Sequence, residues 1–130
     1  MIVLVTGGRE YFNRNHVFQV LDAVHQVEEI TLLIEGGANG ADTFAYEWAA
    51  KNEVDSYRCR AKWKKYQIEG RKNPAGMIRN KAMLSVMGRY PDMFVVFPGG
   101  RGTSGMVSLV EEVNADEEII EILDEREMDF

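Results

Sequence analysis

Met93-Phe-Val-Val-Phe97 runs directly into Pro98-Gly-Gly-Arg-Gly-Thr103, and this stretch decides the fold. Five consecutive apolar residues are typical of a strand that is buried on both faces, as in the middle of a parallel sheet. The strand ends at a glycine-rich turn, after which Thr103 and Ser104 are good N-caps for a helix. Such a turn directs backbone N–H groups and the positive end of a helix dipole toward an anion. The stretch therefore predicts a phosphate-binding turn.

Two more glycine-rich turns follow predicted buried strands, which are residues 2–5 and 30–34. Glycine lets a backbone approach a ligand closely, although such turns also occur simply to pack a helix against a strand. In open α/β folds, the turns after parallel strands meet at one edge of the sheet, where ligands bind. The three turns supply these candidate ligand-binding residues: Thr6, Gly7, Gly8, Arg9, Gly36, Gly37, Ala38, Asn39, Gly40, Asp42, Pro98, Gly99, Gly100, Arg101, Gly102 and Thr103.

Predicted strands and helices alternate along the chain. Residues 54–59 are a third predicted strand, residues 60–75 read as a long loop, and residues 116–123 are either a fifth strand or an extension of the last helix. This order predicts a single Rossmann-like three-layer α/β/α domain over residues 1–130, with a mainly parallel sheet of four to five strands. Three helix faces should pack on it: Val17, Val20, Leu21, Val24 and Val27; Ala41, Phe44, Ala45, Trp48 and Ala49; Ile78, Ala82, Met83 and Met87.

Several side chains in these helices have a predicted structural role. Asn13 or Asn15 is a plausible cap for the first helix, and Asn39 with Asp42 resembles a capping box for the second. We expect Trp48 and the methionines to lie in the core. His16 and His25 have no partner at metal or triad spacing, so we expect them to be solvated helix residues.

Composition excludes several classes of protein. With 45% hydrophobic and 28% charged residues, the chain is an ordinary globular sequence. It has no 18-residue apolar run and no evident secretory signal, so we expect a cytoplasmic protein with no membrane partner. Cys59 stands alone, which excludes an internal disulfide and a thiolate zinc cluster. We expect neither a metal nor a cofactor.

Charge is unevenly distributed. The net charge is −6, yet residues 58–81 hold nine basic side chains and one acid, Glu69. A basic segment on an acidic body favours a local anionic ligand over general affinity for nucleic acid. The alternative is that much of residues 58–65 is simply a solvated loop.

Three arginines are the best phosphate-binding candidates: Arg9, Arg79 and Arg101. Arginine binds phosphate through a bidentate fork and stays charged at any relevant pH; the alternative for each is an ordinary surface residue. Asp42 either accepts ribose hydroxyls or only caps its helix. Three aromatic residues could stack on a base or merely pack: Tyr11, Trp63 and Tyr66.

No catalytic group is evident. The chain has no GKS/T phosphate loop and no GxGxxG fingerprint, and Ser104 and Ser108 have no recognisable base beside them. The identity of any catalytic residue is therefore open.

Together, four motifs resemble the SLOG superfamily of Rossmann-like proteins, and most of all its YspA (cpYpsA-related) branch. They are residues 6–9 (Thr-Gly-Gly-Arg), 36–42 (Gly-Gly-Ala-Asn-Gly-Ala-Asp), 78–81 (Ile-Arg-Asn-Lys) and 98–103 (Pro-Gly-Gly-Arg-Gly-Thr). The superfamily includes cytokinin-activating phosphoribohydrolases, the DNA-processing protein DprA and nucleotide-sensing domains. The resemblance implies a nucleotide or ADP-ribose-like ligand near Arg79, Asn80 and the 98–103 turn. It also implies a homo-oligomer, a dimer or higher.

One departure from the family pattern bears on activity. The phosphoribohydrolases carry a catalytic glutamate three residues after the threonine of this last motif, where this chain has Met106. Methionine cannot act as a general acid or base. Glu47 and Glu111 are the candidates to replace the missing group.

Three hypotheses follow. The first is a binding protein that senses or sequesters a nucleotide-derived small molecule, and the second is a phosphoribohydrolase that cleaves the N-glycosidic bond of a nucleoside monophosphate. The third is a DprA-like binder of single-stranded DNA, which the acidic remainder of the chain disfavours.

Overall fold

The computed structural model describes residues 1–126. Within them, strands and helices alternate in this order: β1 (Ile2–Thr6), α1 (Arg14–Val27), β2 (Leu32–Glu35), α2 (Ala41–Lys51), β3 (Asp55–Arg58), α3 (Ala75–Met83), β4 (Met93–Val96), α4 (Arg101–Val113) and β5 (Glu121–Asp124). All five strands belong to one parallel sheet with the order β3-β2-β1-β4-β5. The predicted Rossmann-like α/β fold is confirmed.

The chain reverses its direction across the sheet beside β1. From β1 it moves outward to β2 and β3, then returns to place β4 on the other side of β1 and β5 beyond it. In open α/β sheets, a crevice forms where neighbouring strands are followed by connections that leave in opposite directions. That position here is the carboxyl end of β1 and β4.

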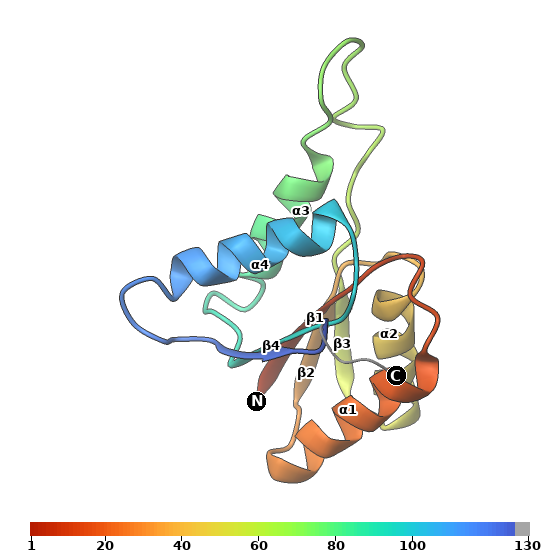
Figure 1. Cartoon of the computed structure of the whole chain (residues 1–130), viewed down its shortest axis with the longest axis vertical. Coiled ribbons are helices and arrows are strands. Elements are labelled where there is room, and N and C mark those ends of the chain that lie inside the picture. Colours follow the sequence, from red (N-terminus) through yellow and green to blue (C-terminus); the bar gives the residue numbers. More distant parts are fainter. Residues whose placement is uncertain (127–130) are drawn as a thin grey trace.

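Helices cover both faces of the sheet (Figure 1). Helices α1 and α2 lie on one side, and α3 and α4 lie on the other. Alternate residues of β1 point to the two faces of the sheet: Val3 packs in the α1–α2 layer and Leu4 packs in the α3–α4 layer. β1 and β4 are buried along their whole length, whereas β3 and β5 are exposed edge strands.

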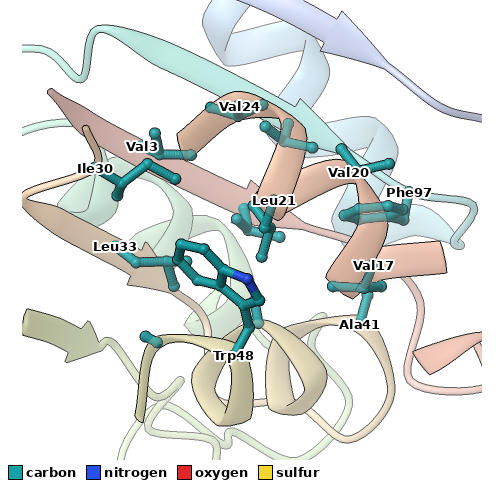
Figure 2. Close-up of a cluster of buried hydrophobic side chains, with 14 of the residues drawn as sticks. Val3, Val17, Val20, Leu21, Val24, Ile30, Leu33, Ala41, Trp48 and Phe97 are labelled. Atoms are coloured by element: carbon teal, nitrogen blue, oxygen red, sulfur yellow. The ribbon is translucent and has the colours of Figure 1, made fainter. Parts of the chain in front are cut away.

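Trp48 is at the centre of the α1–α2 layer (Figure 2). Its side chain is completely buried among residues such as Leu21 and Leu33. Its indole nitrogen donates a 2.8 Å hydrogen bond to Asp22, which removes the cost of burying a polar group there. The prediction that Trp48 is a core residue is confirmed.

The segment between β3 and α3 extends away from the sheet (Figure 1). It corresponds to the predicted long loop. Turns such as Lys65 N–H to Lys62 C=O stabilise it locally, and Asn73 donates a 2.8 Å bond to the carbonyl of Trp63. Residues of this loop lie at the carboxyl end of the sheet, next to the glycine-rich turn after β2.

Two predicted helix starts are wrong. α4 begins at Arg101 with Gly100 as its N-cap, so Thr103 and Ser104 lie inside the first turn; Thr103 is buried there. α2 begins after Gly40, and Asn39 makes no capping bond. In both cases the glycine-rich turn itself leads into the helix, so no side-chain cap is required. For α1, Asn13 is the cap, because its side chain accepts the N–H of His16 at 3.1 Å.

Both histidine predictions are also wrong. His16 is buried with its ring edge-on to Phe97, and it lies 3.8 Å from Glu125. His25 accepts the N–H of Ile30 at 2.9 Å through Nδ1, so it closes the turn between α1 and β2. His25 is half-buried, and its hydrogen bond with the backbone of Ile30 and its edge contact with Trp48 compensate for the part of the ring removed from water.

Some predicted core positions are at the surface. Val27, at the end of α1, is exposed, and so are Ile78, Ala82 and Met87 of the third predicted face. Met77 is exposed as well, against the prediction that the methionines are core residues. The buried residues of α3, which packs on α4, are Ala75, Asn80 and Met83, so Met83 is the one residue of the predicted face that is buried. Because Asn80 is polar, hydrophobic periodicity alone could not identify the buried face of α3.

The ambiguous tail forms β5, a fifth strand that pairs with β4. Asn114 holds the turn before it, because its side chain donates to the carbonyl of Ile120 and accepts the N–H groups of Ile119 and Ile120. None of the helices in residues 1–126 has the length and apolar character needed to cross a membrane.

Candidate functional site

A cavity of about 750 Å³ opens at the carboxyl ends of β1 and β4. We call it the main cavity. It brings together candidate residues from all three glycine-rich turns and from α3: Thr6, Gly7, Gly8, Arg9, Ala38, Asp42, Arg79, Pro98, Gly99, Gly100, Arg101, Gly102 and Thr103. Its volume is within the range of small-molecule sites.

The amino end of α4 faces this cavity. Arg101, Gly102 and Thr103 form the first turn of the helix, and their backbone N–H groups have no acceptor within residues 1–126. Unsatisfied N–H groups and the helix dipole make such an end an anion site when it borders a cavity. The Arg101 side chain is exposed beside it and adds a positive charge.

The turn after β1 is tied to the turn after β4 by backbone contacts. Gly8 donates its N–H to the carbonyl of Pro98 at 2.8 Å, and its own carbonyl accepts from Tyr11 and Ala41. A Cβ on Gly8 would lie 2.8 Å from Cα of Gly99, so a side chain there would force the two turns apart. Close packing of the two backbone turns is therefore enough to explain why residue 8 is glycine.

The turn after β2 uses its amide groups internally. Gly37 N–H donates to Glu35 Oε1 at 2.7 Å, and Ala38 N–H donates to Asp42 Oδ2 at 3.2 Å. Gly40 packs against the backbone of Gly8. The expectation that this turn holds an anion through its backbone N–H groups therefore does not apply to residues 37 and 38.

Five predicted site residues lie outside the main cavity, four of them in the turn after β2 and the fifth, Asn80, in α3. Gly36, Gly37 and Asn39 instead line a second cavity of about 280 Å³, together with Arg9, Ala38, Arg60, Ala61, Trp63 and Arg79. Gly40 lines neither cavity.

Arg79 joins the turns after β2 and β4. Its Nη1 donates to the carbonyl of Gly36 at 2.7 Å, and its Nε donates to Asn80 Oδ1 at 2.9 Å. Both acceptors are neutral, and no carboxylate in the described part of the chain forms an ion pair with Arg79. The guanidinium is thus fixed in position while its charge stays available to a ligand.

Asn80 was a predicted ligand-binding residue, but it lines neither cavity. It is buried, and its amide nitrogen donates to the carbonyl of Gly102 at 3.1 Å while its oxygen holds Arg79. Asn80 therefore positions Arg79 relative to the first turn of α4.

Asp42 is a carboxyl group with unusual surroundings. It lines the main cavity, is only 4% exposed, and its Oδ1 has no hydrogen-bond partner within residues 1–126. Burial raises the pKa of Asp42 from 3.8 to about 7, and the charge of Glu35 contributes to the increase; the hydrogen bond from Ala38 and the charge of Arg79 oppose it. Carboxyl groups with such pKa values are common at functional sites.

A buried ion pair beneath the β2–α2 turn was not predicted. Glu35 is fully buried, and its Oε2 accepts from Arg58 Nε at 2.7 Å. Arg58 also donates to Thr43 Oγ1, which in turn donates to the carbonyl of Ala38. Because Glu35 and Arg58 are distant in sequence, the only local signal was a carboxylate at the end of an apolar strand.

Aromatic side chains surround the mouth of the main cavity. Of the three predicted stacking residues, Tyr11 and Trp63 line it and Tyr66 does not. Phe12, which the sequence did not single out, lines it with 89% of its surface exposed. Exposed rings at a cavity mouth are suited to stacking on a flat ligand.

The proposed substitutes for a catalytic glutamate are elsewhere. Glu47 pairs with Arg14 at 2.8 Å, and Glu111 is exposed in the second half of α4; neither lines the main cavity. Met106 is fully buried in the α3–α4 layer. The acids that do line the cavity are Asp42 and Glu10. In residues 1–126, no group of three histidine, cysteine, aspartate or glutamate side chains is arranged to hold a metal ion.

A comparison with known protein families shows which family the chain belongs to. The model of the YspA, cpYpsA-related SLOG family matches residues 1–66, just over half of the chain. The chain belongs to this family. The part that matches the YspA-related family contains β1, β2 and β3 with the first two glycine-rich turns, whereas Arg79 and the turn after β4 follow it.

A curated relative extends the similarity along the chain. The Gene 61 protein of Mycobacterium phage D29 is 30% identical over 100 residues, which is 76% of this chain and 78% of the phage protein. The match therefore covers most of both chains.

Proposed function

We propose that this protein binds a nucleotide-derived small molecule in the main cavity and holds it without breaking a bond, as a sensor or sequestering protein would. The ligand class is a nucleoside phosphate or an ADP-ribose-like molecule. The observation that carries the proposal is the open first turn of α4, which faces the cavity between Arg79 and Arg101. Membership of the SLOG family supports a nucleotide-related ligand.

Charge and shape favour a phosphate group in this position. Arg9, Arg79 and Arg101 line the main cavity, and none of them forms an ion pair within residues 1–126. Charge-assisted hydrogen bonds from guanidinium to phosphate are about twice as strong as neutral ones. Tyr11 and Trp63 supply aromatic surface for a base.

Calorimetric titration with AMP, ADP and ADP-ribose tests the proposal. At least one of these ligands should bind, and Arg101→Ala should weaken it about tenfold or more, since one charged hydrogen bond contributes about 1.5–3 kcal/mol. Arg101 is exposed, so its loss should leave the fold intact. Arg89→Ala is the matched control, because Arg89 pairs with Asp92 ahead of β4, at the opposite edge of the sheet. If no ligand in the panel binds, or if both variants lose the same affinity, the proposal is wrong.

A phosphoribohydrolase is the second candidate, and Asp42 is the observation that favours it. In N-glycosidic hydrolysis, water adds to C1′ of the ribose and the C1′–N bond breaks, with the base leaving as its protonated form. A carboxyl group with a pKa of about 7 in the ligand cavity is suited to transfer that proton. Chromatography would detect free adenine released from AMP. Release that disappears in Asp42→Asn supports hydrolysis, and no release from a panel of nucleoside monophosphates rejects it.

A further inference from the structure

The second cavity is separated from the main one only by residues that the two share. Arg9, Ala38, Trp63 and Arg79 line both cavities, so they form a common wall. With about 280 Å³, the second cavity lies just below the usual range of small-molecule sites, which suits it to hold one part of a larger ligand.

Its lining is positively charged. Arg9, Arg60 and Arg79 face it, no acidic residue lines it, and none of the three arginines forms an ion pair in the part of the chain that the structure describes. The nearby carboxylate of Glu35 is already engaged by Arg58. Three like charges around one small cavity repel one another unless an anion or water compensates for them.

Two of these arginines lie directly against bare glycine backbone. A Cβ on Gly36 would be 2.6 Å from Arg79 Nη1, and a Cβ on Gly37 would be 2.6 Å from Arg60 Cγ. Because Gly37 N–H donates to Glu35, this backbone offers no free amide at that position. An anion in the second cavity would therefore be held by guanidinium groups.

We propose that the second cavity is a second anion subsite, so that the ligand is a nucleotide with two phosphate groups. One phosphate would lie at the first turn of α4 beside Arg101. The other would lie between Arg60 and Arg79. This inference rests on the proposed function and specifies its ligand class.

Paired titrations separate the two subsites. AMP offers one phosphate, whereas adenosine 3′,5′-bisphosphate offers two separated phosphates and ADP-ribose offers two adjacent ones. At least one of the two-phosphate ligands should bind tenfold or more tightly than AMP to the wild-type protein. Comparison of these two shows which spacing the subsites fit.

Arg60→Gln should remove this advantage and leave AMP affinity within about twofold. The matched control is Arg71→Gln, because Arg71 is exposed in the same loop and lines neither cavity. If AMP binds as tightly as both two-phosphate ligands, or if Arg60→Gln weakens all three equally, the second subsite is wrong while the proposed function stands. If neither these three ligands nor ADP binds, the proposed function fails and the subsite fails with it.

Discussion

Replacing Asp42 by asparagine should stabilise the protein, by an amount that grows as the pH rises. In the unfolded chain the carboxyl has a pKa near 3.8, and in the folded protein burial raises that pKa to about 7. Below pH 4 the group is protonated in both states. Between pH 4 and pH 7 mainly the unfolded chain ionises, so the free energy of unfolding decreases as the pH rises.

The structure sets the size of this effect. A pKa difference of this kind corresponds to about 4 kcal/mol at pH 8, since each pKa unit corresponds to about 1.4 kcal/mol. Asparagine resembles the protonated carboxyl and keeps an oxygen that can accept the N–H of Ala38. Asp42→Asn should therefore equal the wild type near pH 4 and exceed it by up to about 4 kcal/mol at pH 8.

Urea denaturation between pH 4 and pH 8, followed by tryptophan fluorescence, measures this difference. Asp92→Asn is the control with the opposite sign. Hydrogen bonds from Arg89 keep the pKa of Asp92 below its usual range, and the carboxylate also accepts the N–H of Ile2 at 2.7 Å. That variant should be less stable than the wild type by an amount that hardly changes between pH 4 and pH 8, because the pKa of Asp92 lies below this range in the folded protein. A difference between Asp42→Asn and the wild type that does not change with pH would refute the reasoning.

Three further predictions concern packing and positioning. Gly8→Ala should lose about 1–3 kcal/mol of stability in urea denaturation, because its Cβ would meet the turn after β4. A Cβ on Gly100 would meet nothing within 4 Å, so Gly100→Ala should change stability by less than about 0.5 kcal/mol. Similar losses in the two variants would contradict this reasoning. Trp48→Ala should lose about 3–5 kcal/mol in urea denaturation followed by circular dichroism, since the ring is completely buried. A loss below about 1 kcal/mol would be inconsistent with that burial. Asn80→Ala should weaken nucleotide binding severalfold in calorimetry, although Asn80 lines neither cavity, because it fixes Arg79; unchanged affinity would show that Arg79 needs no support.

The sequence predicted the sheet and the place of the turns because those depend on local patterns. The apolar runs of β1 and β4 are buried on both faces, and the glycine-rich turns that follow them lie side by side. In a parallel sheet the carboxyl ends of all strands lie at the same end of the sheet, so the turns that follow the strands meet there. Arg9 and Arg101 lie around one cavity for that reason, whereas Arg79 reaches the same cavity from α3.

What the sequence did not predict depends on contacts between distant residues. Glu35 and Arg58 meet only when β2 pairs with β3, and this pairing places the Arg58 guanidinium in an ion pair with a buried carboxylate. His16 becomes a core residue only because Phe97 lies against it. Local pattern also could not distinguish glycine required for packing from glycine required for a ligand. Gly8 illustrates this, since its N–H is already bonded across to Pro98.

The central claim is that the first turn of α4 is the phosphate site of a nucleotide-binding cavity. A titration of the isotopically labelled protein with AMP, followed by amide NMR, tests it most directly. The account predicts saturable shift changes at the amides of Arg101, Gly102 and Thr103, with little change at Glu28 beyond the far end of α1. Saturation at sites remote from the main cavity, or no shift changes at these three amides at millimolar AMP, would contradict it.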